Sequence, residues 1–207
     1  MTERNPGRAP TFSLWAFLFL YPFNAFADSP TVQIKSTVDQ VIQILTNPQL
    51  QGEVKKQERR KRLREAIVVR FDFQEMAQRS LGPHWQRRTP EEQREFIKIF
   101  SDLLDKTYLD KIESYNNEKF IYLNERIEGL YAEVGSKIQT SKGEEFTINY
   151  RLHQVGEDWR VYDLVIENIS LVNNYRSQFS RILASSTYDE LISRIKARLS
   201  QKGDVVK

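Results

Sequence analysis

The chain has 207 residues, a formal net charge of +3, and charged side chains at 29% of its positions. This length favours one domain or at most two small ones, and the charged fraction excludes a protein with many membrane spans. The absence of cysteine excludes disulfides, thiolate metal sites and a cysteine nucleophile, and two histidines are too few for a multi-histidine metal centre. Twelve Phe, nine Tyr and three Trp exclude a wholly disordered chain.

The first 27 residues have the order of features of a secretory signal peptide. Residues 1–11 carry two arginines, residues 12–20 are nearly all apolar, and Ala25-Phe26-Ala27 places small residues at positions −3 and −1 of a cleavage site. The apolar run is well short of the roughly 20 residues that a membrane-spanning helix needs. We predict a signal peptide over residues 1–27, with an N-terminal anchor or buried helix as the alternative. The mature chain, residues 28–207, is then a single domain exported to a bacterial periplasm.

Capping residues and apolar periodicity predict the helices of the mature chain. Ser29, Asp72, Thr89 and Thr187 are candidate N-terminal caps, and each precedes apolar residues at helical spacing. Asn47-Pro48 and Gly82-Pro83 are candidate ends. The helices predicted on this basis cover residues 30–46, 53–69, 73–81, 90–112, 175–184 and 189–200.

The apolar period changes from 3.6 to 2 in the middle of the chain. Phe146, Ile148, Tyr150 and Leu152 alternate with polar residues, as in a half-buried strand. A turn at residues 156–158 and a strand over 159–166 make this a hairpin, and further strands are predicted over 120–123 and 127–140 with a turn at 141–143. This order of elements favours an α+β fold, with several helices packed around an antiparallel or mixed sheet of about four strands.

No catalytic motif stands out in the sequence. It has no P-loop, no dinucleotide-binding fingerprint, no His-Glu-x-x-His and no Gly-x-Ser-x-Gly. His84 is predicted to lie in a turn and His153 on the polar face of a strand. These positions favour a role in packing or hydrogen bonding for both residues. Asp163 interrupts an apolar strand, so it is either a paired structural carboxylate or the general base of a small acid/base enzyme.

The predicted helix over residues 53–69 is the most basic part of the chain. Between residues 53 and 70, eight basic residues accompany three acidic ones. This run has no aromatic or polar base-reading residues, which argues against nucleic acid. It is either a solvated helix face or a contact for anionic lipid headgroups or an acidic partner. The residues assigned to such a contact are Lys55, Lys56, Arg59, Arg60 and Arg62.

A series of short segments, in a specific order, connects the chain to a known family. The segments are Phe71–Ala77, Ser80–Gly82, Arg88–Phe96, Tyr150–Leu152, Trp159–Asp163, Ser170–Val172 and Asn174–Phe179. Together they resemble the MlaC or toluene-tolerance (Ttg2) family of periplasmic phospholipid-binding proteins. The resemblance extends over roughly residues 32–200. The sequence departs from the family pattern at Asn168, where a glycine is expected.

The resemblance implies a soluble, monomeric, non-enzymatic carrier that shuttles phospholipid between the outer and inner membranes and maintains outer-membrane lipid asymmetry. Its partners would be an outer-membrane lipoprotein complex and an inner-membrane ABC transporter with an MCE-domain subunit. Acyl tails would lie in a hydrophobic cavity between sheet and helices, with the headgroup near solvent. The bound phospholipid would be cargo, and no metal or cofactor is expected. The residues expected to line this cavity are Phe100, Leu104, Tyr108, Ile148, Tyr150, Leu152, Val161, Val165, Ile169 and Leu171. The alternatives are a periplasmic adaptor without a cavity and a small acid/base enzyme that uses Asp163.

Overall fold

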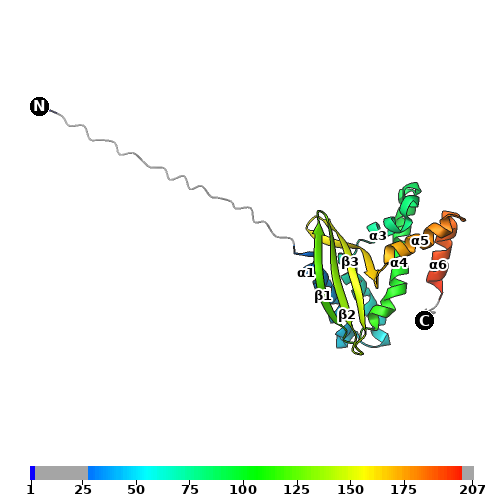
Figure 1. The fold of residues 1–207 in the computed structure, drawn as a ribbon, viewed down its shortest axis with the longest axis horizontal. Coiled ribbons are helices and arrows are strands. Elements are labelled where there is room, and N and C mark those ends of the chain that lie inside the picture. Colours follow the sequence, from blue (N-terminus) through cyan, green and yellow to red (C-terminus); the bar gives the residue numbers. More distant parts are fainter. Residues whose placement is uncertain (3–27, 202–207) are drawn as a thin grey trace.

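The structure is a computed structural model, and it describes residues 1–2 and 28–201. The predicted signal peptide lies almost entirely outside the described residues. In the described part, helices and a five-stranded antiparallel sheet form an α+β fold, which confirms the predicted class. Figure 1 shows the sheet on one side of the molecule, with α4, α5 and α6 beside it and α1 behind it.

Helices α1, α3, α4 and α6 begin at the predicted caps. The helices are α1 (Pro30–Thr46), α2 (Lys56–Arg70), α3 (Phe73–Leu81), α4 (Pro90–Glu113), α5 (Leu171–Leu183) and α6 (Tyr188–Ser200), with three short 3-10 helices η1 (Pro48–Leu50), η2 (Glu53–Lys55) and η3 (Gly82–Arg87). The side chains of Ser29, Asp72 and Thr187 each accept a backbone N–H of the first turn that follows. Thr89 and Glu92 form a reciprocal capping box at the start of α4.

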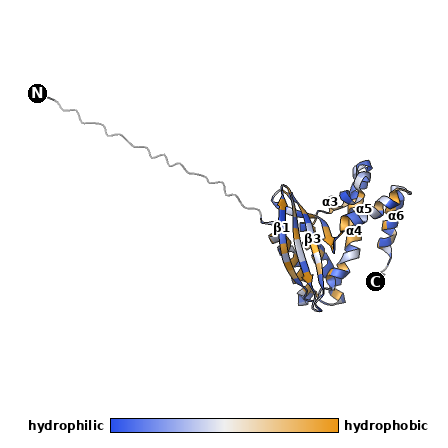
Figure 2. Cartoon of the chain, in the orientation of Figure 1, coloured by the Kyte–Doolittle hydropathy of each residue, from blue (hydrophilic) through white to orange (hydrophobic). Residues whose placement is uncertain are grey.

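The sheet follows the chain order, with each strand antiparallel to the next. Its strands are β1 (Lys119–Glu128), β2 (Tyr131–Gln139), β3 (Glu145–Val155), β4 (Asp158–Ile166) and the two-residue β5 (Ile169–Ser170). Figure 2 shows hydrophobic and hydrophilic residues alternating along the strands. We call the face that α1 covers the inner face, because Val134, Leu152 and Val161 there pack with Ile34 of α1.

Two predicted boundaries in the middle of the chain were wrong. Strands were predicted over 120–123 and 127–140, but the division between β1 and β2 falls at Gly129-Leu130. The polar residues 124–126 belong to β1, and the register of this strand shifts between Tyr122 and Asn124. Helix α5 begins at Leu171, since Ser170 caps it by accepting the N–H of Asn173.

Glu167 and Asn168 form the turn before β5 with φ angles of 48° and 64°. That left-handed conformation favours glycine and tolerates asparagine, which explains the departure at residue 168.

The buried residues form two clusters. The larger one joins α3, α4, α5 and α6 through aromatic side chains, including Phe96, Phe100 and Phe179, with ring centroids 5.8–6.1 Å apart. The smaller one joins α1 to the inner face of the sheet. The space between the two clusters holds the candidate functional site.

Candidate functional site

A cavity of about 750 Å³ lies between the inner face of the sheet and helices α1, α2, α3 and α4. Its lining is mostly aliphatic and aromatic. A void of this size in an ordinary core would forfeit a large amount of packing energy, because the lining atoms have no partners on one side. The cavity is therefore the first candidate for a ligand site.

Helix α1 supplies one wall. Val38, Val41, Ile42 and Leu45 recur at helical spacing and line the cavity, and each is only partly buried. Ile34, one turn earlier on the same helix, is 1% exposed in the smaller core cluster. The first half of the apolar stripe therefore packs against the sheet, and the second half faces the cavity.

The sheet supplies the opposite wall. Ile148 and Tyr150 of β3 and Leu164 and Ile166 of β4 line the cavity because they occupy alternate positions that point to the inner face. The Tyr150 ring is buried, and burial raises the pKa of its phenol to about 12. The phenol is therefore neutral at physiological pH, so it adds no charge to this wall.

Helix α4 supplies a third wall through Leu104, Tyr108 and Ile112. These residues are four apart and lie on one face of the helix. Burial raises the pKa of Tyr108 to about 12 as well. The charged residue Asp105 also reaches the lining, where it is paired with Arg64 of α2.

The cavity opens at the end where α4 finishes. Lys111, Ser114, Glu118, Thr140 and Phe146 belong to its lining, and the first two and Phe146 are exposed. They come from the end of α4, the segment that follows it, and the β2–β3 hairpin. We call these five residues the mouth. The mouth combines polar side chains and one aromatic ring, in contrast to the apolar interior.

Five of the ten residues predicted to line a cavity do so. They are Leu104, Tyr108, Ile148, Tyr150 and Leu171. The α1 residues were not among the predictions, because an apolar stripe at helical spacing has the same sequence pattern whether it faces a solid core or a cavity.

The other five lie outside the lining. Phe100 is buried in the larger core cluster, and Leu152 and Val161 are buried in the smaller one. Val165 is buried, but neighbours in sequence, Leu164 and Ile166, are the residues that face the cavity. Ile169 follows a surface turn and is 63% exposed. Residues 159–171 are mostly apolar, so the sequence alone does not show which of them point into the cavity and which point away from it.

The basic residues of α2 are largely engaged in ion pairs. Arg59 and Arg60 both pair with Glu113 of α4, and Arg64 pairs with Asp105 of the same helix. Lys55 and Arg62 pair with Glu58 within the same basic segment, and Lys56 with Glu53. Arg59 and Arg60 thus attach α2 to α4. The sequence pattern alone did not distinguish this role from that of a solvated helix face or a partner-binding face.

Asp163 is a buried structural carboxylate. It accepts hydrogen bonds from the Ser170 hydroxyl at 2.6 Å and from the Val172 N–H at 3.0 Å, and Arg151 lies 3.3 Å away. These contacts place the carboxylate at the start of α5, where the helix dipole favours negative charge. The two histidines do not contact it. His153 pairs instead with Asp72, with 3.0 Å between Nε2 and Oδ2.

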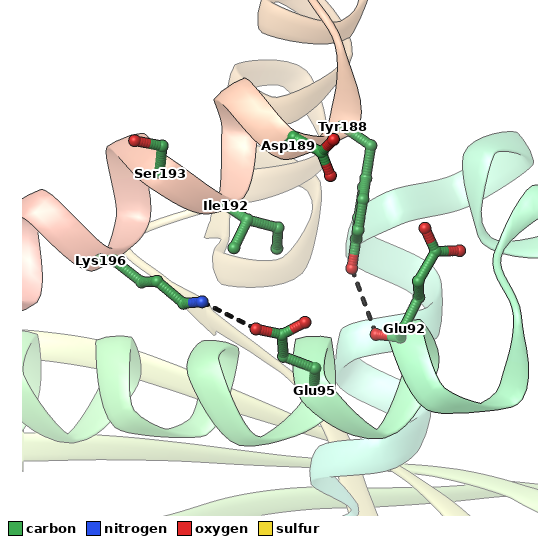
Figure 3. Close-up of a pocket in the computed structure, with 7 residues that line it drawn as sticks. All are labelled: Glu92, Glu95, Tyr188, Asp189, Ile192, Ser193 and Lys196. Carbon is green, nitrogen blue, oxygen red and sulfur yellow. Dashed lines mark hydrogen bonds and ion pairs between the residues drawn. The ribbon is translucent and has the colours of Figure 1, made fainter.

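A smaller pocket of about 350 Å³ lies between α4 and α6. Figure 3 shows two interactions among the residues that line it: Lys196 is paired with Glu95, and the Tyr188 hydroxyl donates to the backbone carbonyl of Glu92. The pocket is a surface depression between two packed helices. The larger cavity, with about 750 Å³ and a mostly apolar lining, is therefore the stronger candidate for a ligand site.

Two further properties bear on the site. Among the described residues, no group of three or more His, Asp or Glu side chains is arranged to hold a metal ion. Within the same part of the chain, no helix is both long and apolar enough to cross a membrane.

The fold and the cavity define an α+β protein that encloses a large apolar site between a sheet and its helices. The family model described as MlaC protein matches residues 35–197. The chain therefore belongs to the MlaC family, as its sequence segments predicted.

Individual relatives agree with this assignment. The chain is 23% identical over 197 residues to the intermembrane phospholipid transport system binding protein MlaC of Haemophilus influenzae, with 92% of this chain and 91% of that protein covered. It is 26% identical over 96 residues to toluene tolerance protein ttg2D of Pseudomonas putida, a match that spans 46% of this chain and 45% of that protein. A solved phospholipid-binding protein of Ralstonia solanacearum, in complex with a phospholipid, has a TM-score of 0.74 and 27% identity, covering 84% of this chain and all of that one.

Proposed function

We propose that the protein is a phospholipid carrier that holds acyl tails in the cavity between α1, α4 and the sheet. The observation that carries this proposal is an apolar cavity of about 750 Å³ with polar residues confined mainly to its mouth. A phospholipid has the same division between apolar tails and a polar headgroup. The names of the H. influenzae and R. solanacearum relatives support the same ligand class. The cavity itself contradicts the alternative of an adaptor that lacks one.

The tail-binding residues in this proposal combine predicted and unpredicted positions. From the sequence prediction we retain Leu104, Tyr108, Ile148, Tyr150 and Leu171. To these we add the α1 residues Val38, Val41, Ile42 and Leu45. The exposed Ile169 is left out.

The energetics of burial favour a carrier that releases its lipid only at a membrane or a partner. Two tails with about 30 CH₂ groups, at roughly 0.8 kcal/mol each, gain about 24 kcal/mol gross on leaving water. Ordering of the lipid and imperfect packing reduce this value, since non-covalent affinities reach a limit of roughly 18–21 kcal/mol. In a membrane the tails are already in hydrocarbon. Docking can therefore set the direction of transfer.

We infer that the carrier works in the periplasm without catalysing a reaction. The signal-peptide features of residues 1–27 support export, and the name of the H. influenzae relative supports transport between membranes. The proposed partners are an inner-membrane ABC transporter with an MCE-domain subunit and an outer-membrane lipoprotein complex. Lys55, Lys56 and Arg62 are the basic residues proposed to contact them, because Arg59 and Arg60 are engaged with α4.

The test is the composition of the purified protein. The full chain is expressed in a Gram-negative host, and the mature protein is purified without detergent and analysed by native mass spectrometry. Bound phospholipid is expected, as is uptake of labelled phospholipid from vesicles by the delipidated protein. A protein that carries no lipid and takes up none from vesicles would overturn the proposal.

A further inference from the structure

The mouth of the cavity contains one basic side chain, Lys111, and this residue is the only basic one in the lining formed by the described residues. Its Nζ lies 5.7 Å from the ring centroid of Tyr108, which lines the interior one turn earlier on α4. Within residues 28–201, no carboxylate lies within ion-pair distance of this amine, whereas Asp110 and Glu113 on either side of it pair with Arg60. Lys111 therefore offers a positive charge, not yet neutralised, where the apolar interior meets solvent.

The mouth also contains one carboxylate, Glu118. Its Oε2 accepts the backbone N–H of Asn116 at 2.6 Å, which holds the side chain in the segment that follows α4. The other acidic residue of the lining, Asp105, is already paired with Arg64. Glu118 is thus the acid available to a ligand at the mouth.

Two hydroxyl groups accompany these charges. The Ser114 hydroxyl donates to the Lys111 carbonyl at 2.7 Å, and the Thr140 hydroxyl accepts the backbone N–H of Glu144 at 3.1 Å. The Thr140 hydroxyl retains a proton to donate, and the Ser114 oxygen retains lone pairs to accept. The mouth therefore provides one cation, one anion and neutral hydrogen-bonding groups.

We propose that the mouth selects a zwitterionic phospholipid headgroup, with the phosphate on Lys111 and the ammonium on Glu118. This inference rests on the proposed function, because it takes the tails to lie in the cavity. A lysine ammonium binds phosphate as a point charge. A headgroup with its own ammonium matches the balanced charges of the mouth, whereas a headgroup whose only charge is the phosphate leaves Glu118 without a counter-charge.

The experiment is a competition between two headgroups on identical tails. Delipidated protein is incubated with vesicles that contain equal amounts of phosphatidylethanolamine and phosphatidylglycerol, and the bound lipid is quantified by mass spectrometry. The wild-type protein is expected to take up phosphatidylethanolamine about threefold in excess. Glu118→Gln should bring this ratio close to one, and Lys111→Gln should lower the affinity for both lipids about fivefold, the effect of losing about 1 kcal/mol at an exposed charge pair.

Matched controls separate selection from a general charge effect. Lys142→Gln and Glu144→Gln change the same charges in the β2–β3 turn, outside the cavity lining, and should behave as the wild type. Circular dichroism of each variant confirms the fold. If both mouth variants keep wild-type affinity and ratio, the headgroup inference is overturned while the carrier proposal stands. If the wild-type protein takes up neither lipid, the carrier proposal itself fails.

Discussion

Arg59 of α2 and Glu113 of α4 form an ion pair that joins two helices of the cavity wall. Arg59 Nη2 lies 2.7 Å from Glu113 Oε1, and the two side chains are 12% and 9% exposed. Arg60 Nη2 lies 2.6 Å from the other carboxylate oxygen, so one carboxylate accepts two guanidinium groups. Together with the pair that Arg64 forms with Asp105, this cluster attaches α2 to α4.

Replacement of Glu113 by alanine should lower the free energy of unfolding by about 3 kcal/mol. Removing one partner of a largely buried pair leaves the other charge uncompensated, which costs far more than the loss of an exposed pair. Urea unfolding followed by circular dichroism measures the change. The control is Glu58→Ala, which removes the partner of Lys55 and Arg62 on the surface and should have little effect. Equal effects of the two variants would contradict a special role for Glu113.

Ile148→Glu should abolish most lipid occupancy while the fold is retained. The new carboxylate would lie in the apolar lining, where either the charge or its neutralisation is costly and competes with acyl tails. The matched control is Ile169→Glu, since Ile169 is exposed and lies outside the lining. Bound phospholipid per protein, measured by mass spectrometry after purification, should fall at least tenfold in the first variant only. Unchanged occupancy in Ile148→Glu would remove β3 from the binding wall.

The contrast between Ile148 and Ile169 shows what the sequence could and could not predict. Alternation along β3 identified the inner face, and the capping residues located the starts of α1, α3, α4 and α6, because both signals are local. The sequence did not show which residues of β4 point to the inner face. The register of β4 with β3 shifts between Arg151 and Leu152, and β4 carries apolar residues on both of its faces. The α1 wall and the partners of Arg59 depend on contacts between segments far apart in the chain. No local pattern distinguishes them from a solid core or a solvated face.

Removal of the lipid should loosen the second half of α1. Val38, Val41, Ile42 and Leu45 face the cavity, so in the empty protein they lack the contacts that acyl tails would supply. Hydrogen exchange measured by mass spectrometry should therefore be faster over residues 38–46 in the delipidated protein, with residues 30–34 and α6, which lies outside the lining, as internal references. A ligand at 100 times its dissociation constant adds about 2.7 kcal/mol of stability, and the unfolding temperature should rise accordingly on reloading. Identical exchange with and without lipid would contradict tail contact by α1.

Tyr150 should make the protein sensitive to strongly alkaline pH. Its pKa is raised to about 12 by burial, while the unfolded chain has a tyrosine pKa of about 10. A group whose pKa is raised in the folded state contributes stability that is fully present below pH 10 and is lost as the pH rises through 12. A pKa difference of two units between the folded and unfolded states corresponds to about 3 kcal/mol in the free energy of unfolding. In urea unfolding between pH 9 and pH 12, the wild-type protein should therefore lose up to this amount relative to Tyr150→Phe, which keeps the ring without the ionisable hydroxyl. Parallel stability profiles for the two proteins would show that the phenol is not held in the buried wall of the cavity.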